Sequence, residues 1–411
     1  MKLRSLEMLR AFAAVLVVLF HTQSIFEMHS GVTPFAGLFG AGLRGVDLFF
    51  VLSGFIIAYV HSADIGRPGR LGNYIFNRAA RIYPAVWFMT LLAGGLYFSG
   101  FGGVAKAGKL TASNVAASML LLPQSGDALV NVTWTLKYEM FFYSVFALMI
   151  FTKRYGVLLL LAWQISVLSS SIFGPFDALG LCGFYFRSLC LDFSVGLACA
   201  WLVNRSSVGV TLNAATQWTL LGIGITTFVG GMMAESYIPF AGIPCAAGAG
   251  AIITALVLLE KADNIRVPNV LVMLGRASYS IYLVHFSVIT LIAVGLIRFH
   301  ALPIKQTGFL AVAMFGIAAG LAFDRFVDQP IQYLLRVHVK PKLFGARQNP
   351  GDRNGMENVE RSNMPFQELC QPAVGHTAVP AATETAGSLA DVRPMPRAAT
   401  MRAAAAASRV R

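Results

Sequence analysis

Two ionisable residues, Arg10 and His21, lie in the first apolar segment of this 411-residue chain. An ionisable side chain at the centre of a membrane span costs roughly 2.5–3.5 kcal/mol on insertion scales, so a chain that keeps two of them has a use for them. Eleven residues make almost three turns of an α-helix, which puts both side chains on one face, roughly 16 Å apart along the axis. The spacing predicts an arginine near one membrane surface and an imidazole deeper toward the other, as a site entered from both sides requires.

A carboxylate on a later apolar segment can complete such a site. Glu139 and Tyr143 are four residues apart and share one helix face, and we expect Glu139 near the depth of His21. A carboxylate beside an imidazole holds its tautomer and stabilises the imidazolium, which makes the histidine a better general base. A pair with Lys137, or a position at the lipid interface, would explain Glu139 without catalysis.

Two arginines, Arg78 and Arg81, are three residues apart on one face of a helix at the inner mouth of the third apolar span. Two guanidinium groups at this spacing can grip a phosphate, which a nucleotide-bearing donor in the cytoplasm would need. Simple anchoring of the loop by positive charge explains the same residues without a ligand.

Further polar residues interrupt later spans. Asp47 follows Arg44 by three residues, and it either neutralises that arginine or orients a catalytic group; the sequence favours neither. His285 is a second histidine within a span, with Tyr282 on a neighbouring face.

The composition is that of a polytopic membrane protein. Hydrophobic residues make up 56% of the chain and charged residues 12%, about half the charge of an ordinary soluble domain. The net charge of +13 could suggest nucleic acid, but the basic residues fall in short loops and in the tail, so no nucleic-acid partner is expected. The five cysteines show neither bridging nor metal-ligand spacing, so we expect no disulfide framework and no metal.

Ten apolar segments are long enough to cross roughly 30 Å of hydrocarbon as helices. Lys and Arg gather in alternate loops, which predicts that both termini are cytoplasmic. The predicted fold is all-α: a membrane-embedded bundle of about ten helices over residues 1–340, then a disordered cytoplasmic tail over 341–411, where apolar periodicity is lost. The predicted spans are residues 5–26, 43–61, 83–102, 132–151, 155–173, 186–203, 215–233, 239–259, 278–297 and 307–326.

Five stretches of the chain together resemble the acyltransferase 3 family of integral membrane O-acyltransferases, most closely its exopolysaccharide-modifying members. They run in the family's order across residues 5–335. The stretches are Leu9 to His21, Gly45 to Phe55, Arg78 to Pro84, Trp134 to Tyr143 and Ser278 to His285.

The resemblance implies a bacterial inner-membrane enzyme that takes an acyl group, usually acetyl from cytoplasmic acetyl-CoA, and delivers it to a sugar hydroxyl facing the periplasm. By position, Arg10 and His21 match the family's arginine-ten-histidine motif, with His21 as the catalytic residue. Arg78 and Arg81 match the double-arginine motif expected to meet the phosphates of coenzyme A. Glu139 falls where the family keeps an acid in the fourth span.

The chain departs from the family pattern at the close of the tenth span, where it has Asp328-Gln329-Pro330 and many members have Glu-x-Pro. This change is mild and puts no catalytic residue in doubt. The extra periplasmic domain of some members is also missing, so the membrane domain or a partner, such as a polysaccharide assembly protein, must hold the acceptor.

The predicted function is O-acetylation of an exported or lipid-linked polysaccharide in the bilayer. His21 deprotonates the sugar hydroxyl while Glu139 steadies the imidazolium, or His21 itself carries the acyl group as a nucleophile. Two alternatives come from other classes. A secondary transporter would show paired broken helices in two related halves, which the sequence does not display. A membrane scaffold would explain the spans but not the polar residues at one depth.

Overall fold

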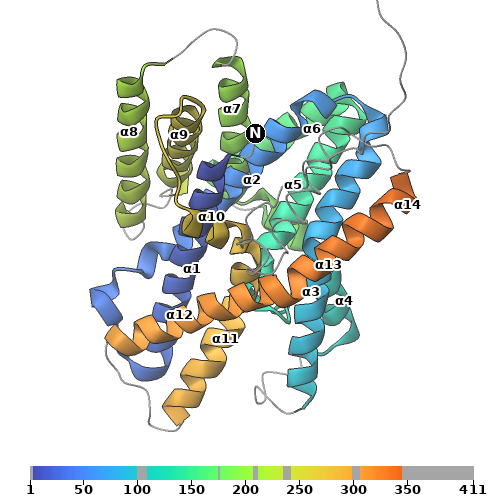
Figure 1. The fold of residues 1–411 in the computed structure, drawn as a ribbon. Coiled ribbons are helices and arrows are strands. Elements are labelled where there is room, and N and C mark those ends of the chain that lie inside the picture. The colour runs from blue at the N-terminus through green and yellow to red at the C-terminus, as the bar shows by residue number, and fades with distance from the viewer. Residues whose placement is uncertain are drawn as a thin grey trace, which may run out of the picture. The chain divides into compact units, whose positions relative to one another are not determined.

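The computed structural model describes residues 3–99, 109–174, 176–206, 212–234, 242–298 and 306–344 (Figure 1). Every regular element in these ranges is helical, so the all-α prediction is confirmed for the part of the chain that the structure describes. The last described helix ends at Phe344, four residues into the segment predicted as a tail. The remainder of that segment lies outside the described residues.

The chain forms fourteen α-helices within the described ranges, joined by turns and short 3₁₀ segments. They are α1 (Arg4–Ser30), α2 (Gly45–His61), α3 (Leu71–Phe98), α4 (Ala112–Leu120), α5 (Trp134–Phe151), α6 (Lys153–Phe173), α7 (Leu191–Ser206), α8 (Ala214–Met233), α9 (Gly242–Lys261), α10 (Asn269–Arg276), α11 (Ser278–Arg298), α12 (Gln306–Phe323), α13 (Gln329–Leu334) and α14 (Lys340–Phe344).

Each of the ten predicted spans coincides with one of these helices, but fewer meet a strict test of length and hydropathy. Six helices of the described chain are long and apolar enough to cross a membrane, and two bent helix pairs raise the number to eight. Helix α5 falls short because Lys137 and Glu139 lie within it. The number of ten spans and the cytoplasmic placement of both termini therefore stay predictions. The six spans are Arg4–Ser30, Gly40–Asp64, Pro68–Phe98, Lys153–Phe173, Gly242–Lys261 and Gln306–Phe344.

The start of α1 is fixed by a carboxylate from a distant helix. Glu260, near the end of α9, accepts hydrogen bonds from the backbone N–H groups of Arg4 at 2.7 Å and Ser5 at 2.8 Å. These are two of the donors that the first turn of any helix leaves without an intrahelical partner. A negative charge at this end also suits the helix dipole. Helix α1, which carries Arg10 and His21, is thus anchored about one and a half turns before Arg10.

Helices α2 and α7 cross with their backbones in contact. A Cβ added to Gly54 on α2 would overlap the carbonyl oxygen of Phe193 on α7, and one added to Gly196 on α7 would overlap the carbonyl oxygen of Val51. Small residues allow this close approach, as is common where helices pack in membranes. The crossing fixes α2, which supplies one wall of the cavity described below.

Helices α12, α13 and α14 form one continuous helix over residues 306–344, drawn in orange in Figure 1. Its first part packs along α11, and α13 packs against α3. Between α12 and α13 the helix widens into a π-helical stretch, Asp324–Asp328. Such stretches often mark functional sites, and this one carries two buried carboxylates.

Candidate active site

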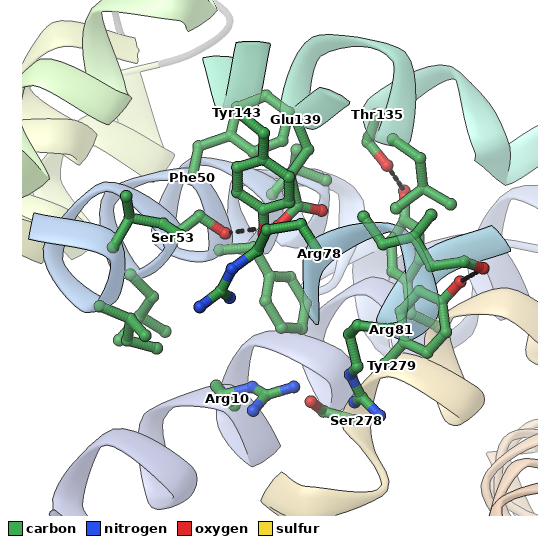
Figure 2. Close-up of a pocket in the computed structure, with 18 residues that line it drawn as sticks. Arg10, Phe50, Ser53, Arg78, Arg81, Thr135, Glu139, Tyr143, Ser278 and Tyr279 are labelled. Carbon is green, nitrogen blue, oxygen red and sulfur yellow. Dashed lines mark hydrogen bonds between the residues drawn. The ribbon is translucent and has the colours of Figure 1, made fainter. Parts of the chain in front are cut away.

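Four of the five predicted site residues line one cavity. Arg10 from α1, Arg78 and Arg81 from α3, and Glu139 from α5 face a space of about 150 Å³ (Figure 2). The three helices that carry these residues are far apart in the sequence and meet only in the folded chain. The remaining lining residues are mainly apolar, with some hydroxyls: Val46, Phe49, Phe50, Leu52, Ser53, Ile56, Ile57, Ile82, Thr135, Leu136, Tyr143, Ser278, Tyr279 and Tyr282.

Glu139 is held at the cavity by two hydroxyl groups. One of its carboxylate oxygens accepts hydrogen bonds from Ser53 Oγ at 2.8 Å and from the hydroxyl of Tyr143 (Figure 2). The bond to Tyr143 confirms that the two residues share a helix face. These two hydrogen bonds run across to α2 and along α5, not toward His21, so the contact with the imidazole stays a prediction. The carboxylate of Glu139 therefore lies at the cavity that Arg10, Arg78 and Arg81 also line.

Arg78 is positioned by a histidine and an aspartate that we did not select from the sequence. A guanidinium nitrogen of Arg78 lies 3.2 Å from Nε2 of His61, and Nδ1 of His61 lies 2.8 Å from a carboxylate oxygen of Asp64. Arginine can only donate hydrogen bonds, so Nε2 accepts and the imidazole proton is on Nδ1, facing Asp64. The guanidinium also lies over the rings of Tyr74 and Tyr143, at 5.9 and 5.6 Å from their centroids.

One donor of Arg78 stays without a hydrogen-bond partner. Its Nε is buried, and no acceptor in the described part of the chain is bonded to it. Buried polar atoms without partners are rare in folded proteins and call for an explanation. An N–H donor beside an arginine-lined cavity is suited to an anionic ligand.

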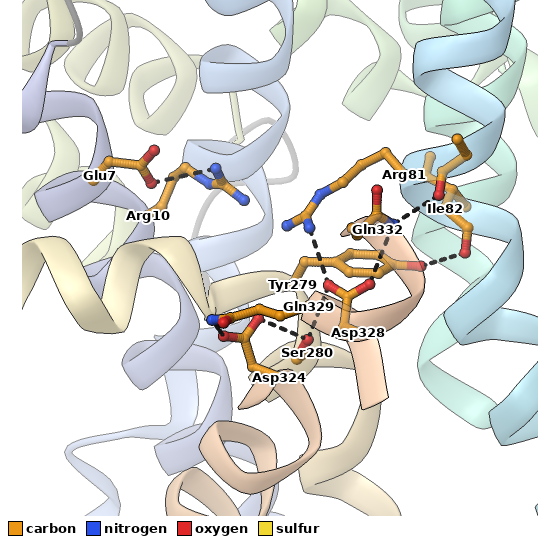
Figure 3. Close-up of polar contacts among 11 residues, drawn as sticks. Glu7, Arg10, Arg81, Ile82, Tyr279, Ser280, Asp324, Asp328, Gln329 and Gln332 are labelled. Carbon is orange, nitrogen blue, oxygen red and sulfur yellow. Dashed lines mark hydrogen bonds and ion pairs between the residues drawn. The ribbon is translucent and has the colours of Figure 1, made fainter. Parts of the chain in front are cut away.

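Arg81 is positioned by the last buried carboxylate of the π-helical stretch. A guanidinium nitrogen of Arg81 lies 3.0 Å from an oxygen of Asp328, whose exposed fraction is 1% (Figure 3). The other oxygen of Asp328 accepts from the side-chain amide of Gln332 at 3.3 Å, and that amide also donates to the carbonyl of Ala80 at 2.7 Å. The guanidinium lies 4.8 Å from the ring centroid of Tyr279.

The Asp-Gln-Pro segment at residues 328–330 supplies the carboxylate that fixes Arg81, a role that the sequence did not predict. Within the same segment, the side chain of Gln329 donates to Asp324 at 2.7 Å (Figure 3). The signal in the sequence was Asp328, an acidic residue in the apolar segment that follows the span containing His285. Its partner could not be read from spacing, because 247 residues separate it from Arg81.

His21 lies outside this cavity. Arg10 and His21 are on one unbroken helix, as predicted, but the residues around the His21 ring are Phe20, Phe286 and His285, at centroid distances of 5.0, 5.0 and 5.3 Å. The two regions meet at Tyr282. This residue lines the cavity, and its ring centroid lies 5.7 Å from that of His285.

The match to known proteins covers almost the whole described fold. The sequence fits the acyltransferase 3 family model, described as an acyltransferase domain, over residues 3–323. The chain belongs to the acyltransferase 3 family. It is also 30% identical to the exopolysaccharide production protein ExoZ of Rhizobium meliloti strain 1021 over 311 residues, 70% of this chain and 90% of that protein. No solved structure matches the chain.

The protein is therefore a multi-pass membrane O-acyltransferase, and its candidate active site consists of the cavity and the pair of His21 and His285.

Arg10 completes the cavity wall and pairs with Glu7 at 3.3 Å on the same helix face. Asp47 of the acyltransferase is bonded to Arg44 at 3.3 Å, which is the neutralising role left open by the sequence. Among the described residues, no group of three or more His, Cys, Asp or Glu side chains could hold a metal ion.

Proposed function

We propose that this acyltransferase moves an acetyl group from cytoplasmic acetyl-CoA to a hydroxyl of an exported or lipid-linked polysaccharide. The observation that carries the proposal is the gathering of Arg10, Arg78 and Arg81 around one largely apolar cavity. Three guanidinium groups in a partly buried space favour a ligand with several negative charges. The phosphates of coenzyme A supply such charges, and its acyl arm supplies an uncharged end.

The arginines are suited to phosphate because their positions are fixed before a ligand arrives. Arg78 is held by His61, and Arg81 is held by Asp328. Each guanidinium has five N–H donors, so one bond to a neighbour leaves most donors for a phosphate. Groups already held in place lose less side-chain entropy on binding, which raises affinity.

The size of the cavity favours the acyl end of the donor over its nucleotide. A volume of about 150 Å³ holds roughly a dozen water-sized groups, taking about 10–15 Å³ for each. That is enough for a thioester and part of its arm. The nucleotide then stays at the cytoplasmic mouth with its phosphates against Arg78 and Arg81, while the acyl arm enters the cavity and the thioester points toward Tyr282 and the histidines.

For the transfer step, His21 takes the proton of the sugar hydroxyl while the hydroxyl oxygen attacks the thioester carbonyl carbon. The tetrahedral intermediate collapses, the carbon–sulfur bond breaks, and the coenzyme A thiolate takes the proton back from His21. The products are an acetyl ester and free coenzyme A. Tyr282 lines the cavity and contacts His285, and Phe49 lines it and contacts Tyr282, so we infer that the thioester reaches His21 past these two side chains.

The relative supports the proposed acceptor and location. ExoZ is named for exopolysaccharide production and comes from a bacterium, which supports a polysaccharide acceptor and the bacterial inner membrane. Family membership favours acyl transfer over secondary transport. Proteins of polysaccharide assembly are the partners that would bring the acceptor to the outer end of α1.

The donor part of the proposal is tested by kinetics in membrane vesicles. Replacing Arg78 and Arg81 by alanine should raise KM for acetyl-CoA by roughly 100-fold or more, since each of the two lost charge-assisted hydrogen bonds is worth about 1.5–3 kcal/mol. The apparent KM for the acceptor should stay near its original value. Replacing Arg154, a basic residue at the start of α6 outside the cavity, by alanine is the matched control. An unchanged KM for acetyl-CoA in the double variant, with normal membrane insertion, would mean that the arginines only anchor the loop.

A further inference from the structure

His285 is a buried histidine with its proton position fixed. Its exposed fraction is 0%, and its ring lies beside that of His21 with the two planes tilted by 41°. Its Nδ1 is 3.0 Å from the carbonyl oxygen of Ile281, one turn earlier on α11. A carbonyl oxygen can only accept, so Nδ1 carries the proton and Nε2 carries the lone pair.

The lone pair on Nε2 is unused. This atom is buried, and no donor in the described ranges is bonded to it. The nearby hydroxyl of Tyr282 already has other partners. It is hydrogen-bonded to the hydroxyl of Thr135 at 2.8 Å and donates to the carbonyl oxygen of Val132 at 3.2 Å. A buried acceptor left without a donor costs free energy, which suggests that the donor arrives during the reaction.

Of the described groups around His21 and His285, His21 is the one that can donate a hydrogen bond to Nε2 of His285. Helix α12 faces His285 with Gly316, where an added Cβ would lie 3.7 Å from the Cβ of His285. On α11 the neighbouring titratable group is the hydroxyl of Tyr282, and on α1 it is the imidazole of His21. Glu139, the group predicted to steady His21, is bonded to Ser53 and Tyr143 instead.

We propose that His285 is the positioning residue for His21, a role that rests on the proposed function. His21 can act as a base only with its lone pair toward the substrate, so its N–H faces α11 and Nε2 of His285. When His21 takes the hydroxyl proton, this N–H becomes a charge-assisted donor to Nε2 of His285, which stabilises the imidazolium and fixes its orientation. The other N–H returns its proton to the coenzyme A thiolate. His285 keeps its own proton on Nδ1 throughout, so the pair ends as it began.

A neutral partner has a specific advantage over a carboxylate here. A carboxylate beside His21 would draw a proton before the substrate arrives and would leave a buried charge between turnovers. A histidine with a fixed tautomer offers a neutral acceptor, and its hydrogen bond with the N–H of His21 becomes strong when His21 carries the positive charge. The pair is then uncharged in the resting enzyme and carries one positive charge only during transfer.

The test compares three replacements of His285 with a matched control. Gln can place an amide oxygen close to the position of Nε2, Asn is too short to do so, and Phe keeps the shape of the ring without an acceptor. Ile289→Val changes a residue with the same exposed fraction, 0%, one turn further along α11. Membrane insertion and thermal unfolding of each variant are measured beside acetyl transfer.

His285→Phe should lower kcat by roughly 100-fold or more, the size of a typical general acid–base contribution, with KM for acetyl-CoA unchanged. The acidic limb of its pH–rate profile should move to lower pH, because the imidazolium of His21 has lost its acceptor. His285→Gln should keep a rate at least about tenfold above that of His285→Asn, which a purely structural role would not produce.

The outcomes separate this inference from the proposed function. A wild-type enzyme without acetyl transfer would remove the proposed function itself, and an active His21→Ala variant would remove the role of His21 in it. An inactive His21→Ala variant together with a His285→Phe variant of normal rate and unchanged pH profile would overturn only the role of His285. If the Phe variant does not insert, equal rates for Gln and Asn would overturn that role, and a Gln rate well above Asn would support it.

Discussion

The carboxylate of Asp328 lies 3.0 Å from the guanidinium of Arg81, although 247 residues separate them in the chain. This ion pair joins the middle of the long α12–α14 helix to α3. One partner lines the cavity and the other is almost completely buried. The last long helix therefore reaches the candidate donor site without contributing a lining residue to it.

Replacing Asp328 by asparagine should weaken donor binding. The change removes the charge that holds Arg81 while keeping the shape of the side chain. We expect KM for acetyl-CoA to rise by roughly tenfold, the lower end for a charge-assisted bond, because Arg81 is partly exposed. Asp263→Asn, on an exposed turn, serves as control. If Asp328→Asn and Arg81→Gln have effects that simply add in the double variant, the two residues do not act together.

The contact between His61 and Arg78 predicts a pH effect on donor binding. Nε2 of His61 accepts from Arg78 only while the imidazole is neutral, and a protonated ring would turn an N–H toward the guanidinium. The groups that face His61 are Asp64, Arg78 and Tyr74. KM for acetyl-CoA should therefore rise on acidification in the wild type.

The matching variant is His61→Gln. Its amide oxygen can still accept a hydrogen bond from Arg78, and unlike the imidazole it does not take up a proton between about pH 5 and 8. Its KM for acetyl-CoA should change less with pH than that of the wild type. His29→Gln, an exposed histidine at the end of α1, should behave like the wild type. Parallel pH profiles for the wild type and His61→Gln would show that His61 does not control Arg78.

The contact between α2 and α7 predicts a site sensitive to one added methyl group. Gly54→Ala would place a Cβ against the carbonyl oxygen of Phe193, and overpacking of this kind costs about 1–3 kcal/mol. The midpoint of thermal unfolding in detergent should fall. Gly95→Ala on α3 adds a Cβ with no neighbour within 4 Å and should not destabilise the protein. Equal midpoints for the two variants would contradict the close crossing.

The predicted orientation can be tested with single cysteines. A cysteine at Gly69, between Arg67 and Arg70, should be protected from a membrane-impermeant thiol reagent in intact cells, since loops rich in Arg and Lys stay cytoplasmic. A cysteine at Ser125, in the exposed turn before α5, should react. Cys182 and Cys370 are replaced by serine first. Labelling at Gly69 and not at Ser125 would reverse the orientation and the donor path.

The sequence was sufficient for the helices and for one part of the site. Long apolar runs specify membrane helices with little dependence on the rest of the fold, so all ten predicted segments coincide with helices. The short helices α4 and α10 were missed, because helices of nine and eight residues leave no such signal. Arg78 and Arg81 were found because both lie on one short stretch.

The partners of the site residues could not be read from spacing. Glu139 was expected beside His21 because both seemed to lie at similar depth, but depth does not say which helices are neighbours. In the fold, Glu139 meets Ser53, 86 residues away, and His21 meets His285. Such pairs depend on how the helices pack, and small residues such as Gly54 and Gly316 decide that packing.

The central claim is tested most directly by following a labelled acetyl group. Proteoliposomes containing the purified protein receive [¹⁴C]acetyl-CoA on the side of Gly69 and the polysaccharide of the source cell on the other side. The wild type should move label to the polysaccharide as an ester that mild alkali removes, and His21→Ala should not, although it inserts equally well. Label transferred at the same rate by His21→Ala, or no label on the polysaccharide with correctly inserted wild-type protein, would contradict the account.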